Sequence, residues 1–300
     1  MKLVKPNLID DTVLVSSSVP ETEPEWAAGT YDKFDQVRVG HDIYESLQDS
    51  NTDEPTAGLL TDPPSWGIAG KTNRFKMFDI TRSTDVRTSN PDEITTILQP
   101  AGIVTSLTLL GLYARTVDVL YKDADNNVVY EQSYDLFDST DITNWWLWFH
   151  VLPRSEQRLA ILDLPGITGG TLTITINHIG DIAECGKLLI GTEWDPGKTQ
   201  PEPPTRLIPV GGGRQRDAFG NLVFISQRVY RETDFSVLVR KALYDSALST
   251  LKDYMAGPIV IIGSQIDKSA IMLGAIKDTP QGKIPTGSPY GIIKFTAEEI

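Results

Sequence analysis

The chain has 300 residues, of which 40% are hydrophobic and 22% are charged, and its formal net charge is −13. This balance is ordinary for a globular protein with a buried core. The acidic excess argues against binding to nucleic acid, because phosphate contacts need clustered Lys and Arg. Cys185 is the only cysteine, so an internal disulfide framework is excluded and folding in a reducing cytoplasm is favoured.

No apolar run approaches the roughly 18 residues that a membrane-spanning helix needs, so we expect no membrane insertion. The first residues are basic, but Pro6, Asn7, Asp10 and Asp11 interrupt the apolar segment that a signal peptide requires. We therefore expect a protein that is made and folded inside a cell without an export signal of its own.

Residues 1–24 are predicted to form an extended arm. The segments 16–18 and 20–24 are rich in Ser, Pro and Glu and cannot bury enough apolar surface to fold alone. One interpretation is a frayed terminus. The other is an arm that lies on a neighbouring subunit, and its candidate contacts are Leu8, Ile9, Val13 and Leu14.

Residues 25–78 are predicted to form a small β module. Two strand-like stretches, 36–39 and 43–47, flank a tight turn at Gly40 and His41. So short a unit needs large aromatic side chains to hold it together. The candidate rings are Trp26, Tyr31, Tyr44 and Trp66. They form either a small aromatic core, which we favour, or a surface on which a glycan or a partner protein packs.

The pattern of the module resembles a known family. Trp26, the run Gly29-Thr30-Tyr31, the run 44–47 (Tyr-Glu-Ser-Leu) and the run 63–66 (Pro-Pro-Ser-Trp) are similar to the small chitin- and cellulose-binding modules of secreted hydrolases. Residues 72–79 (Thr-Asn-Arg-Phe-Lys-Met-Phe-Asp) make it resemble more closely the copies of this module in virion proteins of tailed bacteriophages. The resemblance implies a virion protein.

Residues 79–195 are predicted to form an antiparallel β-sandwich, jelly-roll-like or similar to galactose-binding domains. Strand-like runs recur at short intervals without a convincing helix between them, and residues 171–176 alternate strictly between Thr and apolar residues. Residues 145–151 are predicted to be one of these strands. In a strand Trp146 and Trp148 share a face, which either packs under another layer or contacts a partner.

Residues 196–213 are predicted to be a Pro- and Gly-rich linker, and residues 214–300 an α+β domain. Its one helix is expected over residues 235–254, where apolar side chains fall at helical spacing. A strand pair, a helix that ends before Gly257-Pro258, and further apolar strands resemble the small domain that tail-tube and distal tail proteins share.

No catalytic set emerges, so no catalytic, cofactor-binding or metal-binding residue is predicted. His41, His150 and His178 lack metal-ligand spacing, and Cys185 at the head of an apolar strand is expected to be a buried hydrophobe. A solvated hairpin is favoured over a calcium loop at residues 123–127, which lack the Gly and the distant Glu. The sequence leaves open a pair of glycosidase carboxylates among Asp118, Glu131 and Asp135.

These observations predict a mainly β protein that is a structural component of a bacteriophage tail, in the tail, the baseplate or the fibre-attachment region. It would bind other tail proteins and copies of itself after assembly in the host cytoplasm, without being an enzyme and without a cofactor. The alternative is a glycan-binding protein of the virion that recognises the host. A carbohydrate-active enzyme is the third hypothesis.

Overall fold

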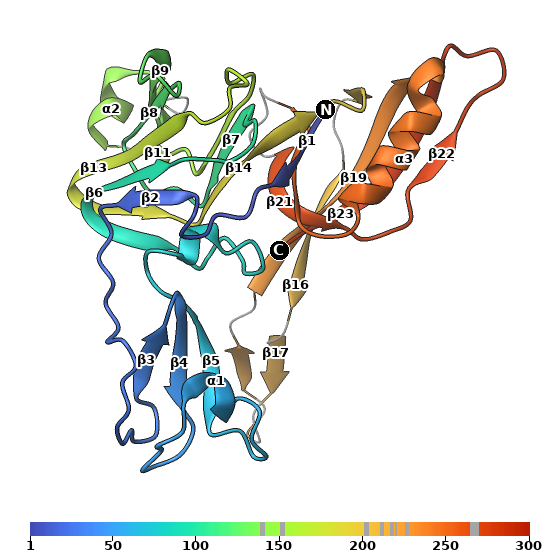
Figure 1. Ribbon diagram of the computed structural model, residues 1–300. Helices are drawn as coiled ribbons and strands as arrows, with labels where there is room; N and C mark the ends of the chain where they lie inside the picture. The colour runs from blue at the N-terminus through green and yellow to red at the C-terminus, as the bar shows by residue number, and fades with distance from the viewer. Residues whose placement is uncertain are drawn as a thin grey trace.

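The computed structural model describes residues 1–138, 142–150, 154–200, 204–210, 213–216, 219, 221–225, 228–264 and 270–300. The protein is mainly antiparallel β structure, and α3 (Tyr244–Tyr254) is the one long helix in these ranges. This confirms the fold class expected from the sequence. Figure 1 shows a small module at one end, a sandwich beside the N-terminus, and a C-terminal unit that carries the long helix.

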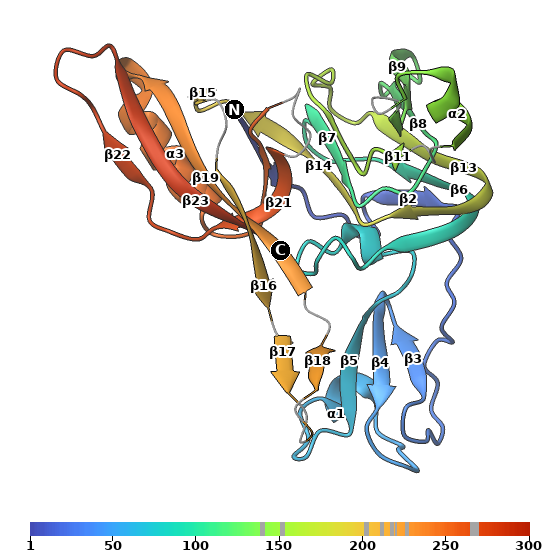
Figure 2. The same ribbon diagram turned by 180° about the vertical axis from the view of Figure 1, so that it is seen from behind.

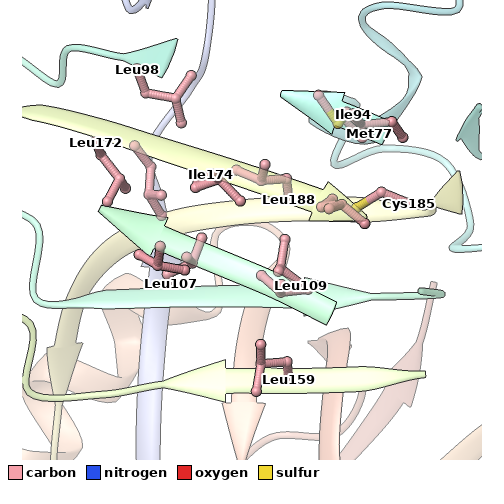
Figure 3. Packing of buried hydrophobic residues seen from close by; sticks show 14 of the residues in the cluster. Met77, Ile94, Leu98, Leu107, Leu109, Leu159, Leu172, Ile174, Cys185 and Leu188 are labelled. Carbon is pink, nitrogen blue, oxygen red and sulfur yellow. The ribbon is translucent and has the colours of Figure 1, made fainter. Parts of the chain in front are cut away.

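Two sheets form the sandwich. One sheet has the strand order β2 (Leu14–Ser17), β6 (Thr88–Leu98), β13 (Thr171–Cys185), β8 (Thr116–Lys122) and β9 (Val128–Asp135). The facing strands are β12 (Arg158–Ile161), β7 (Ser106–Leu110) and β14 (Lys187–Trp194). Side chains from both sheets, such as Leu98, Leu107, Leu172 and Leu188, fill the core between them (Figure 3). The alternation expected in residues 171–176 is present, because Leu172, Ile174 and Ile176 face this core.

The chain passes from one sheet to the other at Gly186, between β13 and β14. A Cβ atom at this position would lie 2.3 Å from the carbonyl oxygen of Thr84 and 2.9 Å from that of Leu110. Real Cβ atoms do not approach backbone oxygens this closely, so only glycine fits. The crossing therefore depends on one residue without a side chain.

Strand β1 (Lys2–Pro6) lies inside the larger sheet, between β14 and β20 (Ile259–Ile262). Leu3 and Val4 are buried on opposite faces of this sheet. The prediction of an extended arm over residues 1–24 is wrong for β1, which lies inside a sheet. It is also wrong for β2, which pairs with β6. The composition of the arm is poor for independent folding, but strands that lie far away in the sequence supply its partners on both sides.

The C-terminal unit is an antiparallel sheet with a helix. Its strands are β19 (Arg228–Arg240), β20, β21 (Ile271–Ile276), β22 (Gln281–Lys283) and β23 (Tyr290–Glu299). The short helix η2 (Lys241–Leu243) and α3 lie between β19 and β20 along the chain. The single helix is present, but it begins at Tyr244 instead of Phe235. Phe235, Val237 and Val239 are buried at every second position of β19, which is the period of a strand.

The predicted linker over residues 196–213 contains paired strands. β15 (Lys198–Thr199) and β16 (Thr205–Val210) both pair with β19, and β17 (Gly213–Arg216) pairs with β18 (Leu222–Ile225). Residues 201–203 and 211–212 lie outside the described residues. The strands β16, β17, β18 and the first part of β19 form a long hairpin, called the hairpin arm below. Figures 1 and 2 show it extending away from the sandwich toward the level of the module.

The N-terminal module is a three-stranded sheet with β3 (Gln36–Val39), β4 (Asp42–Ser46) and β5 (Trp66–Lys71) in sequence order. The turn at Gly40 and His41 joins β3 to β4 as expected, and Gly40 has the positive φ of 60° that such a turn requires. Shorter elements complete the chain: α1 (Pro55–Gly58), η1 (Lys76–Phe78), β10 (Phe137–Asp138), α2 (Trp145–His150) and β11 (Arg154–Ser155).

Candidate interaction surfaces

The aromatic rings of the module form its core. Trp66 is fully buried, and its indole Nε1 donates a hydrogen bond of 2.9 Å to the carbonyl oxygen of Asp53. Tyr31 meets it edge-on at 5.4 Å between ring centroids, Tyr44 is buried beside it, and Trp26 packs against the cluster half-buried. Trp66 has no exposed ring face, so it cannot stack on a sugar. The favoured interpretation from the sequence, a small aromatic core, agrees with this geometry.

A buried amide holds the loop between β4 and β5 in place. Asn51 is fully buried, and its Nδ2 donates to Ser46 Oγ at 3.0 Å and to the carbonyl oxygen of Ser65 at 2.9 Å. Its Oδ1 accepts a hydrogen bond from the backbone N–H of Asp53. The aromatic core and this amide together fix a loop that has little other regular structure.

Residues 72–79 join the module to the sandwich. The side chain of Asn73 donates to the carbonyl oxygen of Ser89 at 2.8 Å and accepts from its N–H at 3.1 Å. Phe75 stacks on His41 with 3.5 Å between ring centroids, and Met77 is fully buried in the sandwich core. The motif that suggested the phage resemblance therefore has a structural role at this junction.

Lys187 secures the junction from the sandwich side. Its side chain is fully buried, and Nζ donates to the carbonyl oxygen of Lys76 at 3.2 Å. Burial lowers the pKa of Lys187 to about 8, while the nearby carboxylate of Asp79 opposes that shift. Burial also raises the pKa of the Cys185 thiol to about 12, so this cysteine is protonated and poorly nucleophilic at neutral pH.

The four apolar residues proposed as partner contacts of the arm serve different purposes. Ile9 is buried in the sandwich core, and Val13 and Leu14 pack against that core partly buried. Leu8 is 70% exposed. Three of these side chains are thus used within the chain, and Leu8 remains on the surface.

The tryptophan-rich run forms helix α2, so the strand predicted over residues 145–151 is wrong for 145–150. Asn144 caps the helix, because its Oδ1 accepts from the N–H of Leu147 at 2.9 Å. Tryptophan favours strands, but this cap and the hydrogen bond from Trp148 N–H to the carbonyl oxygen of Asn144 select the helix. Residues 151–153 lie outside the described residues.

Helix α2 exposes large aromatic rings. Trp145, Trp146, Trp148 and Phe149 have exposed fractions of 80%, 66%, 53% and 75%. Trp146 stacks on His150 at 4.2 Å, and Trp148 lies 6.2 Å from Phe137, measured between ring centroids. The sequence named Trp146 and Trp148 as a partner contact but missed Trp145. The signal that could have found it is Asn144, a typical N-cap directly before the run.

A cavity of about 410 Å³ opens beside this helix. Its walls are Ile142, Thr143, Asn144, Trp145 and Trp148. Trp146 and Phe149 lie outside these walls, although they are on the same helix. The cavity therefore divides the exposed rings of α2 into two groups.

The hairpin arm carries a second exposed apolar surface. Its exposed apolar side chains are Leu207, Val210, Phe219, Leu222 and Val229, of which Leu207 and Val229 share one face of the strand pair and Val210 lies on the other. Ion pairs fix the base of the arm: Arg206 pairs with Glu232 at 3.2 Å and with Asp234 at 2.6 Å. Leu207 and Val229 line a cavity of about 300 Å³ that Ser83 and Leu110 also line, and Phe219 lies farther along the arm.

Two of the carboxylates considered for catalysis, Asp118 and Glu131, line one open hollow of about 390 Å³, whereas Asp135 pairs with Arg115 at 3.7 Å. Asp118 Oδ2 accepts a hydrogen bond of 2.6 Å from Asn177, and it lies on the outer face of the sandwich with Glu131. Asp123 accepts hydrogen bonds from the N–H groups of Asp125 and Asn127, which closes a tight hairpin. Within the described ranges, no group of three or more His, Cys, Asp or Glu is arranged to hold a metal ion.

In the part of the chain that the structure covers, no helix is long and apolar enough to cross a membrane. No protein-family model matches the chain, and the search of curated proteins found no match.

Proposed function

We propose that this chain is a structural component of a bacteriophage tail, in the tail, the baseplate or the fibre-attachment region, and that it acts through protein–protein assembly. The observation that carries the proposal is the hairpin arm. Leu207, Phe219 and Val229 are 68%, 90% and 53% exposed along a hairpin that leaves the main body of the molecule. Several large apolar side chains exposed on one element mark interaction sites in folded proteins.

The continuity of the larger sheet supports the same proposal. β1 makes the sandwich strands and the C-terminal strands parts of one hydrogen-bonded sheet. Val4, Leu189 and Val260 belong to one buried cluster that extends across this junction. A subunit that holds its neighbours at fixed positions in an assembly needs parts that do not move relative to one another.

The partners proposed are other tail proteins and further copies of this chain, in a virion assembled in the host cytoplasm. The resemblances of residues 25–79 and of the C-terminal unit to phage virion proteins support this choice. The fully buried, protonated Cys185 argues against a cysteine nucleophile.

Assembly of the purified chain tests the proposal. We expect rings or larger assemblies by light scattering and electron microscopy, and we expect the double variant Leu207→Asp/Val229→Asp to remain monomeric. The matched control is Ile179→Asp, since Ile179 is 88% exposed but belongs to the sandwich. A wild-type chain that stays monomeric, alone and with extracts of tail components, contradicts the proposal. Equal assembly of both variants contradicts the role of the hairpin arm.

A further inference from the structure

Helix α2 presents its aromatic rings on one broad side. Successive residues of a helix lie about 100° apart around its axis, so Trp145, Trp146, Trp148 and Phe149 cover roughly 160° of the circumference. Leu147 lies on the opposite side and is half-buried. Figures 1 and 2 both show α2 at the outer edge of the sandwich. The rings therefore project from the molecule, and Leu147 is the residue that turns toward it.

This aromatic side is a poor match for a protein groove. A helix that binds in a groove places anchors at i, i+3, i+4 and i+7, whereas α2 has six residues and cannot supply the last of them. A Trp or Phe side chain presents about 150 to 250 Å², so the exposed parts of the four rings amount to roughly 400 to 700 Å². A standard protein interface takes about 800 Å² from each partner. The rings alone fall short of that area.

A lipid surface makes different demands. The interface of a bilayer accepts aromatic rings one at a time and needs no matching shape. Trp is enriched there because the body of the indole is apolar while its N–H group can donate to the oxygens of the headgroups. A short convex element with several exposed rings, such as α2, meets these demands.

We propose that α2 binds the interface of a lipid bilayer, with Trp145, Trp146 and Phe149 inserted among the headgroups. Binding of this kind holds a protein on the membrane surface and needs no membrane-spanning helix. It does not depend on the assembly role proposed above, because it uses α2 and not the hairpin arm.

The charges around α2 specify the kind of lipid. Arg115 pairs with Asp135 at 3.7 Å, and Arg154 is in register with Asp138 in the β10–β11 pair. These four residues carry two charges of each sign, and Asp141, before the helix in the sequence, adds a negative charge. The whole chain has a net charge of −13. Attraction to anionic headgroups therefore contributes little, and the lipid that fits best is zwitterionic.

Vesicles of phosphatidylcholine test the proposal with the full chain, by co-sedimentation and by quenching of tryptophan fluorescence with lipids brominated near the headgroup. We expect binding that changes less than about twofold between about 0.1 and about 0.5 M salt, because salt screens only charge attraction. Trp145→Ala, Trp146→Ala and Phe149→Ala should each weaken it about three- to tenfold, since each removes one inserted ring. The triple variant should lose binding. Vesicles that also contain phosphatidylglycerol should bind no more tightly.

Ile179→Ala is the matched control. Ile179 is 88% exposed on β13, so its loss should leave vesicle binding within about twofold of the wild type. The proposal is overturned if the wild type binds neither kind of vesicle, or if binding requires phosphatidylglycerol and is lost in salt. Equal binding by the wild type and the triple variant overturns it as well. The triple variant should assemble like the wild type, and a loss of its assembly would assign α2 to a protein partner instead.

Discussion

The two tryptophan clusters of this protein use the same side chain in opposite ways. Trp66 is fully buried in a module that has almost no other core, whereas Trp145 is 80% exposed beside a cavity. The comparison teaches that a sequence pattern can locate aromatic residues without showing which way the rings face. In the module the rings replace a hydrophobic core that so few residues cannot otherwise build. The sandwich already has its own core, and the rings of α2 remain exposed.

Trp66→Ala should have the largest effect of the substitutions that test this contrast. Removal of a fully buried indole from the core of the module should destabilise it by about 3 to 5 kcal/mol, enough to unfold a unit of this size. Loss of protection from amide hydrogen exchange in β3, β4 and β5 would show it, with the sandwich still protected. A module that stays folded would mean that Trp66 is not its main support.

Asn51→Ala should come next. It removes the hydrogen bonds from Asn51 to Ser46 Oγ and to the carbonyl oxygen of Ser65, which keeps only its bond from the N–H of Leu47, and this should cost about 1 to 3 kcal/mol. Chemical denaturation followed by the fluorescence of the module is the measurement. A change below the error of that experiment would show that water replaces the amide.

Asn144→Ala is the matching change on α2. The cap is exposed, so its loss should destabilise the helix by about 1 kcal/mol and leave the rest of the sandwich unchanged. We expect faster exchange of the amides in residues 147–150 and no shift of the main unfolding transition. A shift of that transition would show that α2 is coupled to the core of the sandwich.

Trp145→Ala should have the smallest effect on stability. An exposed ring that supports no core should change the free energy of unfolding by no more than about 0.5 kcal/mol. Thermal unfolding of this variant beside Trp66→Ala compares the two clusters directly. A loss similar to that of Trp66→Ala would mean that α2 is part of a core.

Local patterns in the sequence predicted much of this fold. The alternation of residues 171–176, the turn at Gly40 and His41, and the presence of a helix before Gly257 agree with the structure. The period of two at Phe235, Val237 and Val239 was also visible in the sequence, although a helical interpretation of the same residues obscured it. The start of α3 could therefore have been predicted more closely.

Other features could not be predicted because they depend on distant parts of the chain. β1 has only Leu3 and Val4 as buried apolar residues, and its place in the sheet is set by β14 and β20. The cavity beside α2 needs Trp145 and Trp148 on neighbouring turns of a helix, whereas strand propensity puts them on opposite faces. Of the residues beside this cavity, the sequence therefore predicted only Trp148 as a contact.

The position of β1 also constrains the order in which the chain can fold. During synthesis β1 is made long before either of its neighbours, because Leu3 pairs with Trp194 on one side and with Ile261 on the other. Until β20 is complete, one edge of this strand has no hydrogen-bonding partner, and unpaired edges favour association between chains. Pairings this distant in sequence also slow folding. A cell that makes many copies at once is therefore expected to depend on chaperones, or on slow synthesis, to bring the two ends of the chain together before neighbouring chains meet.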